Sequence, residues 1–273
     1  MKAHQGTHPR GAFFLAGVLV LGLAACALPA RADDGGIENV GGAARLLTDQ
    51  GHIRMLAETV RARVSQDSIE VNCEFTFVNH GPADTVLIGF PVRSSGADVC
   101  GDCSDESMTI QPMTGFRSWV DGVEVECTAM PDAEHTGEQE YAYWWTKSVP
   151  FAAGQTRVIR DYYIESPGYD SMDGRSFAYI LETGASWAGT IGSAEIIVTM
   201  VGFSSSSIAS METKPRIRGQ ELRWSFRNFE PGVDGPASIG FRWIHPGSWG
   251  YWDHFVSELK RAVQGDDEEA GSE

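Results

Sequence analysis

The chain has 273 residues, of which 42% are hydrophobic, and its 21 basic and 37 acidic side chains give a net charge of −16. This length suffices for one large domain or two small ones with an apolar core. The negative charge argues against binding to nucleic acid or to an anionic membrane surface, because its long-range field repels both.

Residues 1–32 have the layout of an export signal. A short basic start precedes an uncharged apolar run at 12–24, and Ala30-Arg31-Ala32 supplies a small-residue cleavage site before Asp33. The run is too short to span a hydrocarbon core of about 30 Å. We therefore predict a signal peptide and a mature protein that is periplasmic, held in the cell envelope or secreted, without a transmembrane segment.

A second processing signal overlaps the first. Leu23-Ala24-Ala25-Cys26 has the form of a lipobox, in which Cys26 would be lipidated and become the mature N-terminus. A lipid chain adds roughly 0.8 kcal/mol of membrane affinity for each buried methylene. A lipoprotein anchored through Cys26 is therefore the alternative to a soluble exported protein.

The first predicted elements follow a Gly-rich segment at 33–50, which we expect to be loose. In Ser68–Asn79, alternate apolar side chains from Ile69 to Phe77, with Cys73 among them, share one face, and this period of two indicates a half-buried strand. Thr85–Phe90 is predicted to form the next strand and to end at Pro91.

The region 116–127 is predicted to be a hairpin, because Asp121-Gly122 supplies the positive φ angles that a two-residue turn needs. A polar loop at 131–142 suggests a domain junction. Further strand-like segments lie at Trp144–Val149, Thr156–Ile164, Ser176–Leu181, Ala194–Val201, Leu222–Phe226 and Ser238–Ile244. Many short strands separated by turn residues predict an all-β protein, an antiparallel β-sandwich, with two packed sandwich domains at 51–130 and 143–247.

The C-terminal region contains the predicted helix. Trp252, Phe255, Leu259 and Val263 form an apolar stripe, so we expect one short helix at 248–264 that docks on the sandwich. The acidic segment 265–273 has no large apolar residue and is predicted to be disordered.

Four cysteines remain after the signal: Cys73, Cys100, Cys103 and Cys127. An even number in an oxidising compartment favours two disulfides, although the sequence does not choose among the three pairings. Cys73 with Cys127 across the sandwich and Cys100 with Cys103 in a tight loop is one such pairing. The same four residues also have the ligand number of a zinc site.

Cys100-Gly101-Asp102-Cys103 has the spacing of a redox motif, but acidic neighbours would raise the thiol pKa. No nucleophile motif, phosphate-binding loop or paired histidine motif accompanies it. We therefore predict no catalytic, cofactor-binding or metal-binding residues and no cofactor.

Two aromatic clusters, Tyr141 to Trp145 and Trp249 to Trp252, are the candidates for binding a protein or glycan partner if they are exposed. Core packing is the alternative role for the same side chains.

Several segments together resemble one family of exported bacterial proteins, catalogued as domain of unknown function 4424. The matching landmarks are Ile53 to Glu58, the strand Val71–Asn79 and Gly89-Phe90-Pro91. The order of these landmarks before Val120-Asp121-Gly122 also resembles the von Willebrand-associated (VIT-type) module of inter-α-trypsin inhibitor heavy chains. Either resemblance implies a β-sandwich; the first implies export, and it supplies no activity or catalytic residues.

The sequence therefore favours a non-catalytic exported protein that acts as a binding or structural module. A thiol-redox or zinc protein using Cys100 and Cys103 is the first alternative. A hydrolase whose site assembles only in three dimensions is the second.

Overall fold

The computed structural model describes residues 37–48, 51–96, 113–131, 143–170 and 174–244. The strands in the first half are β1 (Ile37–Gly42), β2 (Arg45–Leu46), β3 (Ile53–Val64), β4 (Ile69–Asn79), β5 (Asp84–Gly96), β6 (Met113–Val120), β7 (Val123–Val125) and β8 (Thr128–Pro131). Those in the second half are β9 (Tyr143–Phe151), β10 (Thr156–Glu165), β11 (Gly168–Tyr169), β12 (Gly174–Ile180), β13 (Ile191–Met200), β14 (Ile208–Met211), β15 (Arg216–Arg218), β16 (Glu221–Phe229) and β17 (Ser238–Ile244). Two short 3-10 helices are η2 (Glu182–Ser186) and η3 (Ser205–Ser207). No helix within these ranges is long and apolar enough to cross a membrane.

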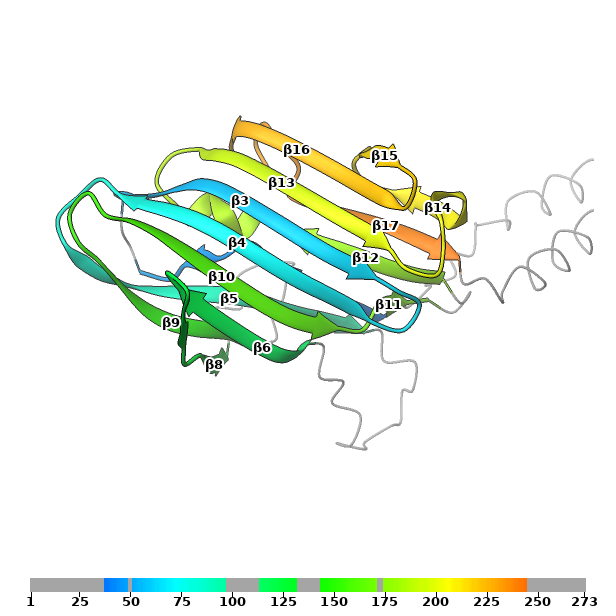
Figure 1. Cartoon of the computed structure of the whole chain (residues 1–273), viewed down its shortest axis with the longest axis horizontal. Coiled ribbons are helices and arrows are strands. Elements are labelled where there is room, and N and C mark those ends of the chain that lie inside the picture. Colours follow the sequence, from blue (N-terminus) through cyan, green and yellow to red (C-terminus); the bar gives the residue numbers. More distant parts are fainter. Residues whose placement is uncertain (1–36, 49–50, 97–112, 132–142, 171–173, 245–273) are drawn as a thin grey trace, which may run out of the picture. The chain divides into compact units, whose positions relative to one another are not determined.

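The strands form two large sheets, so the predicted all-β class with packed antiparallel sheets is confirmed. One sheet has eight strands in the order β15-β16-β13-β3-β4-β10-β6-β7, and the other has nine, with the path β14-β17-β12-β11-β1-β5-β9-β8 and β2 paired to β5. Most neighbours are antiparallel, but β13 pairs with β3 and β1 pairs with β12 in parallel. Figure 1 shows the central strands of the eight-stranded sheet in front of those of the other sheet.

Both sheets contain strands from each side of the 131–142 segment. In the eight-stranded sheet β4 pairs with β10, and in the other sheet β5 pairs with β9. The described residues therefore form one sandwich rather than the two expected at 51–130 and 143–247. The local patterns predicted many of the strands, but they carried no information about these long-range pairings.

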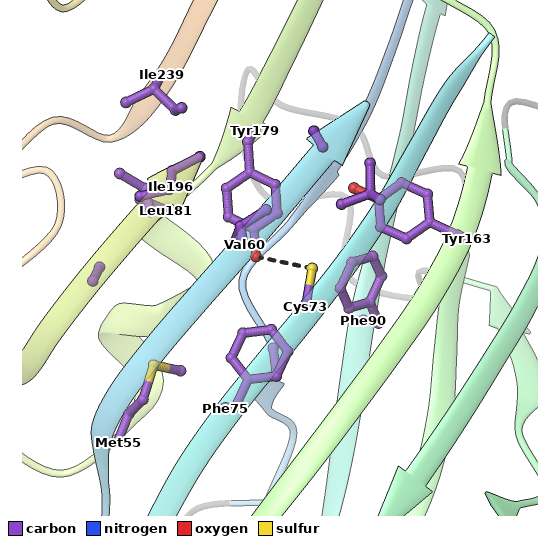
Figure 2. Packing of buried hydrophobic residues seen from close by; sticks show 14 of the residues in the cluster. Met55, Val60, Cys73, Phe75, Phe90, Tyr163, Tyr179, Leu181, Ile196 and Ile239 are labelled. Carbon is purple, nitrogen blue, oxygen red and sulfur yellow. Dashed lines mark hydrogen bonds between the residues drawn. The ribbon is translucent and has the colours of Figure 1, made fainter. Parts of the chain in front are cut away.

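A single large cluster of buried side chains fills the space between the two sheets. It takes Phe75 and Phe77 from β4, Phe90 from β5, Tyr163 from β10 and Trp243 from β17. The alternation predicted for β4 is confirmed, since its apolar side chains from Ile69 to Phe77 are all buried. Figure 2 shows how side chains from both sheets meet in this core.

The Asp121-Gly122 hairpin is also confirmed. β6 and β7 pair on either side of it, and the φ angles are 51° at Asp121 and 83° at Gly122. The predicted end at Pro91 is wrong, because β5 continues through this residue to Gly96. On one edge of β5, β2 pairs with residues up to Gly89 and β1 pairs from Arg93 onward. Pro91 lies between these two partners, where its missing N–H interrupts neither ladder.

The Gly-rich segment is not loose where it is described, since residues 37–42 form β1 in the interior of the nine-stranded sheet. A Cβ atom at Gly41 would overlap the hydroxyl group of Tyr163, and one at Gly42 would lie 2.6 Å from Cβ of Ile180. Glycine is therefore required here by close packing between neighbouring elements. The signal peptide at 1–32, the helix at 248–264 and the tail at 265–273 lie outside the described residues.

Candidate functional site

A groove of about 850 Å³ runs across the outer face of the eight-stranded sheet. It crosses β16, β13, β3, β4, β10 and β6, which lie side by side in Figure 1. The lining residues are Thr59, Arg61, Ala62, Arg63, Asn72, Cys73, Glu74, Trp119, Gly122, Arg160, Asp161, Ile197, Thr199, Glu221 and Arg223. A volume of this size suits a small-molecule ligand.

Strand alternation places the polar side chains in this groove. On β3, Val60, Ala62 and Val64 are buried, whereas Arg61 and Arg63 are exposed. On β4, Asn72 is exposed on the face opposite the buried apolar side chains. The groove is therefore the polar side of strands whose apolar side forms the core.

Ion pairs occupy the carboxylates of the groove. Nε of Arg160 lies 2.6 Å from a carboxylate oxygen of Glu74. The guanidinium of Arg223 lies 2.7 Å from Glu195 and 3.0 Å from Glu221. These carboxylates are bound to arginine, so their geometry favours a role in positioning the arginines over a role as free acids or bases.

A second polar cluster lies between the sheets. The Tyr179 hydroxyl, from β12, donates a hydrogen bond of 2.7 Å to Glu58 on β3, and it also lies 3.7 Å from Sγ of Cys73 on β4. Figure 2 shows the Tyr179 side chain reaching Cys73 in the core. Glu165, on β10, accepts a hydrogen bond from the backbone of Gly41. These groups connect the two sheets.

Burial changes the titration of this cluster. Loss of solvation raises the pKa of Glu58 to about 7, against the lowering effect of the hydrogen bond from Tyr179. The same cause raises the pKa of Glu165 well above its usual range. Both side chains are almost inaccessible to solvent, with exposed fractions of 1% and 3%. They are therefore structural groups, closed off from a ligand in the groove.

The raised pKa of Glu58 predicts that stability falls as pH rises. Between its ordinary value of 4.5 and about 7, the folded protein keeps a proton that the unfolded chain releases, so raising the pH favours unfolding. From pH 5 to pH 8 we expect this residue to lower the free energy of unfolding by up to about 3 kcal/mol. Urea titrations should show that Glu58→Gln removes much of this dependence, since glutamine can still accept from Tyr179. An equally steep dependence in the variant would contradict the assignment.

Of the three pairings that the sequence leaves open, Cys73 with Cys127 is not formed in the structure, where both residues are free thiols. Cys73 is buried and hydrogen-bonded to the Tyr179 hydroxyl. Its burial raises the pKa of the thiol well above 9.0. Cys127 lies after the end of β7, where its Sγ contacts the carbonyl oxygen of Val125 at 3.9 Å. Cys127 does not continue an inward-facing strand toward Cys73, since β7 ends at Val125 and its Val123 is 68% exposed.

The other predicted sites fall outside the described residues. These are Cys100 and Cys103, the lipidation candidate Cys26, and the aromatic cluster at 249–252. In the described ranges, no three histidine, cysteine, aspartate or glutamate side chains come close enough to hold a metal ion.

The described residues of the other aromatic cluster, Tyr143 to Trp145, all pack in or against the core. Trp144 is buried, in agreement with core packing. Tyr143 and Trp145 are partly buried and pack against each other edge to face, with ring centroids 5.6 Å apart. Neither residue lines the groove, whose aromatic side chain is Trp119 on β6.

Sequence reasoning missed the arginines of the groove. Arg61 and Arg63 alternate with Val60, Ala62 and Val64, which is the signal that could have identified them. Arg223 lies on a predicted strand, but its proximity to Arg61 depends on the parallel pairing of β3 with β13. A single sequence gives no indication of that pairing.

Comparison with known proteins finds solved structures that are similar to this chain in fold, but no similar sequence family. No protein-family model and no curated protein sequence matches the chain. Among solved structures, a candidate nutrient-binding protein from Legionella pneumophila is similar with a TM-score of 0.60 and 19% identity, over 83% of this chain and 77% of that one. At this identity the match shows a shared fold.

Two further solved structures match more weakly. An M1 zinc metallopeptidase from Deinococcus radiodurans has a TM-score of 0.37 at 10% identity, over 71% of this chain and 43% of that one. Yeast LTA4 hydrolase has a TM-score of 0.40 at 10% identity, over 72% of this chain and 30% of that one.

Proposed function

We propose that this protein is an exported, non-catalytic binding module that holds a small polar ligand in the groove on the outer face of its eight-stranded sheet. The groove itself carries the proposal, because its volume suits a small molecule and its lining combines charged, amide, hydroxyl and aromatic groups. The layout of residues 1–32 supports export, with lipidation at Cys26 as the membrane-anchored alternative.

The arrangement of titratable groups favours binding over catalysis. Glu74 is paired with Arg160, and Glu221 with Arg223. Glu58 and Glu165, whose pKa values are raised, lie between the sheets and do not line the groove. The described part of the groove thus offers hydrogen-bond donors and charge without a free acid–base pair.

One likeness supports the binding role and another supports export. The Legionella pneumophila protein of similar fold is a candidate nutrient-binding protein, which agrees with a role in binding a small molecule. The landmarks around Ile53 to Glu58 and Gly89 to Pro91 resemble the exported family of domain of unknown function 4424, and this resemblance supports the proposal that the protein is exported.

Filling the groove is expected to abolish ligand binding without unfolding the protein. Asn72 is exposed at the centre of the groove on β4, so Asn72→Trp adds volume on the solvent side only. A ligand that binds the folded state raises the melting temperature by mass action. We expect a thermal-shift screen of sugars, amino acids and organic acids to find compounds that stabilise the natural protein and not Asn72→Trp. Equal stabilisation of both proteins by every hit would place the ligand elsewhere.

A further inference from the structure

A row of arginines crosses one end of the groove. Arg216 on β15 pairs in register with Arg223 on β16, which pairs with Ile197 on β13. Ile197 pairs with Arg61 on β3, which pairs with Asn72 on β4. We call these five residues the arginine row. It contains three arginines and no acidic residue, although the whole chain has a net charge of −16.

Two of the three arginines in this row lack an ion-pair partner among the described residues. Arg216 lies directly opposite Arg223, and like charges in that position destabilise a sheet. Arg223 is bonded to Glu195 and Glu221. Arg61 and Arg216 form no ion pair with any described residue. The row therefore combines one guanidinium held by two carboxylates, that of Arg223, with two that form no ion pair, those of Arg61 and Arg216.

The surroundings of Arg61 suit an anionic group attached to a polar body. Ile197, only 8% exposed, forms an apolar floor between Arg61 and Arg223. On the other side of Arg61, the exposed amide of Asn72 can donate and accept hydrogen bonds. Thr59 and Thr199, which also line the groove, add hydroxyl groups. A guanidinium fork matches the geometry of a carboxylate or a phosphate.

Building on the proposed function, we infer that the ligand is a sugar carrying a carboxylate or a phosphate, held through Arg61 next to the ion-paired Arg223. The ring lies against Ile197, and its hydroxyl groups bond to Asn72 and the two threonines. Trp119 is too distant for a single ring, because β4 and β10 separate its strand from β3 and neighbouring strands are about 4.8 Å apart.

The test compares three probes of similar size by isothermal titration calorimetry on the full mature chain at low salt. Glucuronate and glucose 6-phosphate carry the two candidate anions, and glucose carries none. We expect the preferred anion to bind at least about tenfold more tightly than glucose, and Arg61→Gln to weaken it by about tenfold or more. Added salt should weaken binding of the anion as well.

Arg227→Gln is the matched control. Arg227 is exposed on the same strand as Arg223 and does not line the groove, so this variant makes the same charge change elsewhere. Arg227→Gln should bind the anion as tightly as the natural protein does. If Arg227→Gln and Arg61→Gln weakened anion binding equally, the effect would be one of non-specific charge, and the inference would be overturned. Equal affinity for glucose and the two anions would also overturn it while leaving the groove as the binding site. If none of the three binds, the inference is wrong, and the groove-filling comparison decides the proposed function separately.

Discussion

Replacing Lys147 with methionine is expected to lower the free energy of unfolding by about 3–5 kcal/mol. Nζ of Lys147, on β9, lies 2.6 Å from the carboxylate of Asp161, on β10, and both side chains are almost completely inaccessible to solvent. The pair joins the two sheets. Without the lysine, Asp161 would be left as a buried charge without compensation. Chemical denaturation of the purified variant measures the resulting loss in the free energy of unfolding.

Two controls separate this effect from lost packing. Arg160→Met removes an ion pair of the same length, 2.6 Å, from the neighbouring residue of β10, but that pair is exposed and should contribute less than about 1 kcal/mol. The double variant Lys147→Met with Asp161→Leu removes both charges and should recover most of the stability. If it were as unstable as the single variant, buried charge would not be the cause.

Gly42→Ala is expected to cost about 1–3 kcal/mol, although it adds one methyl group. The new Cβ would lie 2.6 Å from Cβ of Ile180 and 2.8 Å from its carbonyl oxygen, where β1 and β12 run in parallel. Neither atom can move without shifting the strand. The effect opposes the gain of roughly 0.4–1 kcal/mol that a Gly-to-Ala change gives where the backbone tolerates it.

Gly51→Ala is the matched control, since an added Cβ there meets no atom within 4 Å. We expect its thermal and urea midpoints to equal or slightly exceed those of the natural protein. If Gly42→Ala behaved in the same way, β1 would not be packed in the sheet interior as described.

The sequence was sufficient to predict strands with regular alternation. The alternate apolar residues of β4 predicted that strand, and Asp121-Gly122 predicted the turn between β6 and β7. β3 was missed because its pattern is broken twice, by the bulge between Met55 and Ala57 and by the buried polar residue Glu58. A buried carboxylate that bonds across the core looks like a solvent-facing position in the sequence alone.

The candidate site was less predictable than the fold, for a physical reason. Each groove residue is an ordinary polar residue on the outer side of its own strand. Arg61 and Arg223 become neighbours only through β13, which lies between β3 and β16. Likewise, the glycines of β1 resembled a loose segment because the side chains that require them, Tyr163 and Ile180, are far along the chain. Local patterns therefore identified the layers but not the contacts across them.

An NMR titration of the protein with the preferred sugar anion, following side-chain signals, tests whether the groove holds the ligand. We expect saturable shifts of the Nε–H signals of Arg61 and Arg223, with little change at the indole N–H of Trp243, which is buried in the core. Saturable binding that leaves both arginine signals unmoved and shifts residues elsewhere would contradict this expectation.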